Sequence, residues 1–177
     1  MGLFTALTAL GSFVRIPFFP VPLTLQSFFP LLAGCFFSPM AAATTQIAYL
    51  CLGLAGLPVF NQGGGIMYVL HPTFGYLLAM PLTAALVSYW VGRDHRQAGF
   101  GRIFRITFSC GLFLLLIGSL WLFVIFSWVS DVEMTPMKAI WLGMIIFIPA
   151  ESLKAFAATF LTKKIQHRIK IQTGGAV

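Results

Sequence analysis

A carboxylate and an ammonium group stand three residues apart inside an apolar stretch of the chain. Glu151 and Lys154 belong to the string F-I-P-A-E-S-L-K at residues 147–154. Residues at this spacing share one face of a helix, and charged groups in a membrane segment are expected to face the interior of a helix bundle. A carboxylate accepts from N–H groups and an ammonium donates to a carbonyl, so the pair could bind a buried cyclic urea. The alternative is an internal ion pair that only ties the helix in place.

Five other polar side chains stand out in the apolar sequence. Taken singly, each is more often a hydrogen bond between helices than a ligand contact. Taken together they form a sparse polar set, which suits a mostly apolar pocket with few polar contacts. These further candidate binding residues are Thr24, Gln26, Tyr49, Asn61 and Tyr76.

Two irregular segments, residues 15–22 and 57–71, connect the helices near these groups. Prolines at three positions exclude a regular helix from the first segment, and the second contains a glycine run at 63–65. Both carry apolar side chains, and irregular backbone at membrane depth is tolerated where it packs against protein or lines a cavity. We expect both segments to cap the outer end of the bundle, either as lids over a ligand or as plugs against water.

The composition is typical of an integral membrane protein. Of the 177 residues, 59% are hydrophobic and 8% are charged, whereas a soluble domain has about 25% charged residues. No Asp, Glu, Lys or Arg occurs between Arg15 and Arg93. A helix of that length would cross a bilayer core of about 30 Å several times, so the chain must fold back on itself.

Proline and glycine clusters divide the chain into six apolar segments. The sequence therefore predicts a single all-α transmembrane domain over residues 1–177, built as a six-helix bundle. Pro149 is expected to kink the last helix. The predicted helices span residues 1–14, 23–38, 40–56, 72–92, 106–129 and 136–162, and a basic cytoplasmic tail follows at 163–177.

Basic residues orient the predicted bundle, because loops rich in Lys and Arg stay on the cytoplasmic side. With six crossings, the two basic regions fall on the same side, which places both termini in the cytoplasm. Asp131 and Glu133 would lie on the opposite side of what we expect to be the cell membrane. The basic residues are Arg93, Arg96, Arg102 and Arg105 in one region and Lys163, Lys164, Arg168 and Lys170 in the other.

Several classes of function are disfavoured. The basic residues are explained as topology anchors and not as a nucleic-acid surface. Metal binding is not expected, because His71, His95 and His167 are scattered over both sides of the predicted membrane. No phosphate-binding loop, nucleophile elbow or paired catalytic carboxylates occur, so ATP would have to bind to another chain and no catalytic residue is assigned.

The first predicted helix has small residues at four-residue spacing. Gly2 is followed by Ala6, and Thr5 by Ala9. Faces of this kind let helices approach closely. We expect Gly2, Ala6 and Ala9 either to dock a partner subunit in the membrane or to pack within the bundle.

Several strings together resemble the BioY family of biotin transporters, the S-components of energy-coupling factor (ECF) systems. The resemblance covers roughly residues 6 to 160. The most specific strings are P-V-P-L-T-L-Q at residues 20–26 and G-L-P-V-F at 56–60, and the stretch P-A-E-S-L-K at 149–154 also matches.

The resemblance implies biotin uptake by a non-enzymatic six-helix S-component with no cofactor, in which biotin is the transported ligand. It implies that Glu151 and Lys154 contact the ureido ring, that the loops after the first and third helices cap the pocket, and that Asn61 adds a polar contact. The family usually has Asp in place of Glu151 and often Gly in place of Phe74. The implied partners are a transmembrane coupling subunit and two cytoplasmic ATPases. An S-component for another vitamin, a small membrane-embedded enzyme and a structural subunit remain the alternatives.

Overall fold

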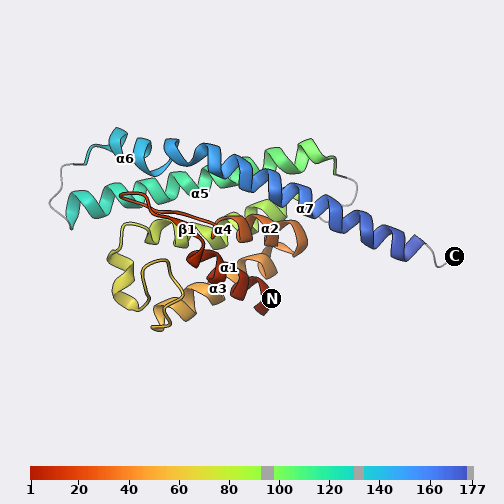
Figure 1. The fold of residues 1–177 in the computed structure, drawn as a ribbon, viewed down its shortest axis with the longest axis horizontal. Coiled ribbons are helices and arrows are strands. Elements are labelled where there is room, and N and C mark those ends of the chain that lie inside the picture. Colours follow the sequence, from red (N-terminus) through yellow and green to blue (C-terminus); the bar gives the residue numbers. More distant parts are fainter. Residues whose placement is uncertain (93–97, 130–133, 175–177) are drawn as a thin grey trace.

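The protein is an α-helical bundle (Figure 1), described by a computed structural model over residues 1–92, 98–129 and 134–174. The predicted loop positions Arg93, His95, Arg96, Asp131 and Glu133 lie outside the described residues. The helices are α1 (Gly2–Phe13), α2 (Phe28–Phe36), α3 (Pro39–Leu54), α4 (Phe74–Val91), α5 (Phe100–Trp128), α6 (Pro136–Gly143) and α7 (Ile148–Gly174), with 3₁₀ turns η1 (Ile66–Leu70) and η2 (Ile145–Phe147). The predicted all-α class is confirmed.

Within the described residues, three helical stretches are long and apolar enough to cross a membrane: Phe74–Val91, Phe100–Trp128 and Pro136–Gln166. Helices α1 and α3 are apolar but shorter. Helix α4 contacts α2, α3 and α5, and α7 packs on α2 and α5. The protein is therefore a membrane protein in which α4, α5 and α7 form the long framework.

The predicted helix over residues 23–38 is wrong at its start. Residues Leu23–Thr24 form strand β2, which pairs antiparallel with β1 (Arg15–Ile16). A helix beginning at Leu23 would place Pro30 in its interior, where proline removes a hydrogen bond and clashes with the preceding turn. Because α2 begins at Phe28, Pro30 falls in the first turn, whose N–H groups have no intrahelical partner in any case.

The last two predicted helices also differ from those of the structure. Helix α5 begins at Phe100 and not at residue 106, because Arg102 and Arg105 are good helix formers despite their charge. The predicted helix over residues 136–162 is broken into α6, η2 and α7. The break ends just before Pro149, whose ring would clash with the carbonyl of Ile145 in a continuous helix. Beyond residue 162, α7 continues to Gly174, so the described part of the predicted tail is helical.

The irregular segments gather at one end of the bundle. In Figure 1 the hairpin of β1 and β2, the yellow segment between α3 and α4, and the C-terminal end of α5 lie toward the left. The C-terminal end of α7 lies at the far right. The two apolar loops therefore lie at the same end, as expected of a pair of caps.

Candidate substrate-binding site

Glu151 and Lys154 form a buried ion pair in the first turns of α7. The Lys154 Nζ lies 3.2 Å from Glu151 Oε2, and the side chains are 13% and 1% exposed, respectively. Glu151 stands in the first turn of α7, where the helix dipole favours a negative charge. As their spacing predicts, the two side chains lie on one face of α7, where they contact each other.

Ser27, just before α2, bonds both members of this pair. Its hydroxyl donates to Glu151 Oε2 over 2.9 Å and accepts from Lys154 Nζ over 2.8 Å. The second carboxylate oxygen, Glu151 Oε1, is buried and has no hydrogen-bond partner among the described residues. A buried polar atom without a partner is costly, so this oxygen is a ready acceptor for an N–H group.

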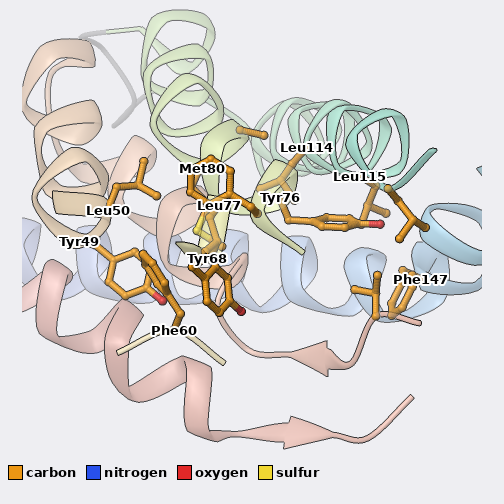
Figure 2. Close-up of a cluster of buried hydrophobic side chains, with 14 of the residues drawn as sticks. Tyr49, Leu50, Phe60, Tyr68, Tyr76, Leu77, Met80, Leu114, Leu115 and Phe147 are labelled. Atoms are coloured by element: carbon orange, nitrogen blue, oxygen red, sulfur yellow. The ribbon is translucent and has the colours of Figure 1, made fainter. Parts of the chain in front are cut away.

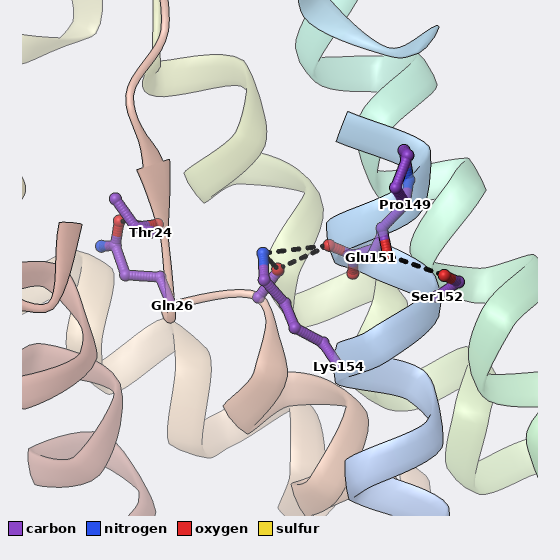
Figure 3. A network of polar contacts seen from close by, with 7 residues as sticks. Thr24, Gln26, Pro149, Glu151, Ser152 and Lys154 are labelled. Carbon is purple, nitrogen blue, oxygen red and sulfur yellow. Dashed lines mark hydrogen bonds and ion pairs between the residues drawn. The ribbon is translucent and has the colours of Figure 1, made fainter. Parts of the chain in front are cut away.

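Thr24 and Gln26 lie across from α7, on the segment that leads from β2 into α2 (Figure 3). Thr24 Oγ1 donates to Gln26 Oε1 over 3.1 Å, and Gln26 Nε2 donates to the Tyr49 hydroxyl. Tyr49 in turn donates to the Val59 carbonyl over 2.9 Å. These bonds join α3 to the segment between β2 and α2 and to the loop after α3, and they hold Gln26 in one orientation.

These groups line one small cavity of about 50 Å³. The sequence-predicted residues Thr24, Gln26, Asn61, Tyr76, Glu151 and Lys154 all contribute to its wall. Tyr49 does not, because it is fully buried behind Gln26. The structure thus brings together six of the seven predicted binding residues, taken from the segment between β1 and α2, the loop after α3, and helices α4 and α7.

The rest of the wall is mostly apolar. Leu114 and Leu115 on α5 face Tyr76, and Phe147 lies at the end of the buried cluster opposite Tyr49 and Phe60 (Figure 2). The lining residues that sequence reasoning did not single out as candidates are Val21, Pro22, Leu23, Ser27, Tyr68, Thr73, Leu77, Met80, Leu114, Leu115 and Phe147. Ser27 could have been suspected from its place beside Gln26, but the α5 leucines look like any others in an apolar helix.

An arginine connects the two loops above the cavity. Arg15 Nη1 donates to the backbone oxygen of Asn61 and, over 3.0 Å, to its Oδ1. The Phe18 ring packs edge-on against Phe147, with 6.3 Å between the centroids. The hairpin therefore contacts both the second loop and the start of α7, and covers the cavity from outside.

A polar network supports the second loop. His71 Nδ1 lies 2.7 Å from Thr73 Oγ1, and its Nε2 lies 3.1 Å from Gln62 Oε1. The Tyr68 hydroxyl lies 3.0 Å from Thr73 Oγ1. Burial lowers the pKa of His71 and raises the pKa of Tyr68. Both side chains are therefore neutral near pH 7 and act as fixed hydrogen-bonding groups.

The described residues contain no group of three His, Cys, Asp or Glu side chains that could hold a metal ion.

The predicted small-residue face of α1 is partly exposed and partly buried. Gly2 and Ala6 are exposed and Ala9 is partly buried, whereas Thr5 is buried and donates to the Thr45 carbonyl over 2.9 Å. Of the three predicted docking residues, Gly2 and Ala6 are thus open at the surface, and Ala9 only in part.

Comparisons with known proteins agree with this architecture. The model of the BioY family matches residues 1–171. A probable biotin transporter BioY of Pyrococcus horikoshii is 35% identical over 170 residues, covering 94% of this chain and 93% of that protein. The biotin transporter BioY of Thermotoga maritima is 31% identical over 166 residues, covering 93% and 92%. A probable biotin transporter BioY of Lysinibacillus sphaericus is 50% identical over 93 residues, which are 52% of this chain and 47% of that protein.

The fold has a counterpart among solved structures. The crystal structure of the S-component for biotin from an ECF-type ABC transporter superposes with a TM-score of 0.80 at 25% sequence identity, and covers 94% of this chain and 88% of that one. The predicted S-component type of bundle is therefore confirmed. Because the family model matches residues 1–171, which are nearly the whole chain, this chain belongs to the BioY family.

Proposed function

We propose that this protein is the membrane-embedded, biotin-binding S-component of an ECF-type uptake transporter. The observation that carries the proposal is the buried triad of Glu151, Lys154 and Ser27 in the wall of a cavity that also has apolar side chains and a few neutral polar ones. Its relatives are named as biotin transporters, and its structural counterpart as an S-component for biotin.

The chemistry of the triad suits the ureido ring of biotin. An N–H of the ring would donate to Glu151 Oε1, the buried oxygen that lacks a protein partner. The ring carbonyl would accept from Lys154 Nζ, which has a third hydrogen beyond those directed at Glu151 and Ser27. The apolar remainder of the bicyclic ring would lie against Leu114, Leu115 and Phe147. Thr24, Gln26, Asn61 and Tyr76 would complete the contacts, with Tyr49 supporting Gln26 from behind.

Binding requires the two loops to move. The cavity of about 50 Å³ is smaller than the roughly 300–1,000 Å³ of small-molecule pockets. The hairpin and the segment after α3 are joined to each other by Arg15 and Asn61, so we propose that they open as a unit to admit biotin and close over it.

Transport would require partner subunits. The sequence has no phosphate-binding loop, so we propose that two cytoplasmic ATPases and a transmembrane coupling subunit supply the energy. The exposed Gly2 and Ala6, with Ala9 beside them, would admit a coupling-subunit helix at close range. Co-purification from native membranes should recover an ATPase pair.

The direct test is biotin binding to the detergent-purified protein, measured by calorimetry or with radiolabelled biotin. Wild type is expected to bind stoichiometrically, and Glu151→Ala and Lys154→Ala are each expected to lose at least about 2 kcal/mol of binding free energy, the value of a hydrogen bond to a charged group. Lys164→Ala, at an exposed position farther along α7, is the matched control and should bind as wild type does. Folded wild type that does not bind biotin, or that prefers another vitamin in competition, would contradict the proposal.

A further inference from the structure

Helix α5 places two glycines on the face that lines the cavity. Gly111 and Gly118 are both buried and stand seven residues apart, which is about two turns and about 10 Å along the helix axis. Leu114 and Leu115 lie between them and line the cavity. These four residues form one strip of α5, called here the α5 strip.

Gly111 leaves room for the side chain of Glu151. A Cβ atom at position 111 would lie 2.9 Å from Glu151 Cγ, 2.9 Å from its Oε1 and 3.3 Å from its Cδ. Glu151 could not retreat freely, because Ser27 and Lys154 both hold its Oε2. Any side chain at position 111 would therefore displace the carboxylate or break one of those two bonds.

Gly118 does the same for Tyr76 at the other end of the α5 strip. A Cβ atom there would overlap the Tyr76 ring. The ring is fixed at its far end, where the hydroxyl donates to the Gly143 carbonyl over 2.6 Å. A side chain at position 118 would push the ring out of its place in the cavity wall.

We propose that Gly111 and Gly118 are positioning residues that set the dimensions of the ligand site. Gly111 seats the Glu151 carboxylate at the polar end, Gly118 seats the Tyr76 ring, and the two-turn spacing between them fixes how large a head group fits beside Leu114 and Leu115. This role depends on the biotin-binding function proposed above. It makes α5 the template against which α4 and α7 place their binding side chains.

The test is a double-mutant cycle on biotin affinity with Gly111→Ala and Glu151→Asp. Asp is one methylene shorter, so its carboxylate ends nearer to the α7 backbone and clears a Cβ atom on α5. Gly111→Ala is expected to weaken binding about tenfold in wild type and less than about twofold in the Glu151→Asp background, an interaction typical of contacting residues. Gly118→Ala is expected to show the same relief in a Tyr76→Leu background.

Gly101→Ala is the matched control, because a Cβ atom there meets nothing within 4 Å; it should leave affinity unchanged. Thermal unfolding without biotin reports folding separately. If Gly111→Ala fails to fold while the double variant folds and binds, the steric role of Gly111 is supported. Equal losses in both backgrounds, or a double variant that does not fold, would overturn it while biotin binding by wild type stands. Folded wild type that does not bind biotin would overturn both proposals.

Discussion

Glu151 is fully buried, and this sets the energetics of the site at the scale of single residues. Desolvating a carboxylate and an ammonium costs several kcal/mol each, and their attraction offsets this cost only with good geometry and additional hydrogen bonds. Ser27 supplies one such bond to each partner. The arrangement keeps one carboxylate oxygen available for a ligand at the expense of leaving it unsatisfied in the protein.

Ser27→Ala is expected to weaken biotin binding by about 1.5–3 kcal/mol, or roughly 10- to 150-fold, because it removes hydrogen bonds to two charged groups. Titration of purified protein with biotin checks this value. Ser152→Ala is the control, since Ser152 bonds only the Pro149 carbonyl within its own helix turn. An unchanged affinity for Ser27→Ala would show that the ion pair needs no third member.

Lys154→Ala is expected to destabilise the fold more than the double variant Glu151→Ala/Lys154→Ala does. The single change leaves a buried carboxylate without its cation, which costs about 3–5 kcal/mol, whereas removing both charges removes that penalty. Thermal unfolding in detergent without biotin gives the comparison. A double variant that is less stable than Lys154→Ala would contradict the expectation.

At the scale of elements, the two outer loops behave as one cover. Arg15 on the hairpin bonds Asn61 on the loop after α3, and Phe18 packs on Phe147 in η2, just before α7. The Phe19 side chain at the hairpin tip is 83% exposed, whereas Val21 is buried in the core. The rate of ligand release is therefore expected to depend on the bond between Arg15 and Asn61.

Arg15→Ala is expected to speed biotin release by about fivefold, the kinetic equivalent of about 1 kcal/mol for one partly exposed hydrogen bond. A chase experiment with labelled biotin measures the release rate directly. Arg105→Ala, at an exposed position near the start of α5, serves as the control. Equal release rates for Arg15→Ala and wild type would show that this bond does not hold the cover closed.

Acidification is expected to loosen the loop after α3. Because burial lowers the pKa of His71 below 6.5, the unfolded loop binds more protons than the folded one between the two pKa values, and stability falls as the pH drops through that window. Protonation also removes Nδ1 as the acceptor for the Thr73 N–H. The hydrogen-exchange protection factors of residues 57–73, corrected for the intrinsic exchange rate at each pH, should fall between about pH 7 and about pH 5. His71→Gln should show a flatter profile, and identical profiles would contradict this role.

At the scale of the whole molecule, two groups of basic residues lie at the end of the bundle opposite the two loops over the cavity. The described cations Arg102 and Arg105 lie at the start of α5, and Lys163, Lys164 and Arg168 lie in the C-terminal half of α7. The two loops that cover the cavity lie at the opposite end (Figure 1). By the positive-inside rule, we propose that the cavity opens outward and that both termini face the cytoplasm.

Thiol labelling of intact cells tests this orientation. In a Cys51→Ala background, with Cys35 and Cys110 buried, a membrane-impermeant maleimide should label Gln62→Cys from outside. Lys164→Cys should react only after permeabilisation. The reverse pattern would invert the proposed topology and place the cavity on the cytoplasmic side.

Much of this molecule was predictable from local rules. Charge-free apolar segments separated by Pro and Gly predicted a helical membrane bundle, because a bilayer demands internally bonded backbone. The spacing of Glu151 and Lys154 predicted their pairing, because residues three apart share a helix face. The start of α2 was missed because residues 23–24 pair as a strand with residues 15–16. The apolar character of residues 23–38 suggests a helix and gives no sign of this pairing.

The sequence by itself determined the class of protein, the polar pair and the family resemblance. Only the tertiary structure decided which other groups meet that pair. Ser27 lies 124 residues from Glu151 and bonds it only because α2 packs on α7. Sequence reasoning placed Tyr49 in the site, whereas in the structure it is buried behind Gln26 and does not line the cavity. Gly111 and Gly118 could not be singled out from the sequence, because the role proposed for them depends on their lack of a Cβ atom. That lack matters only because the folded protein places the side chains of Glu151 and Tyr76 in the space beside them.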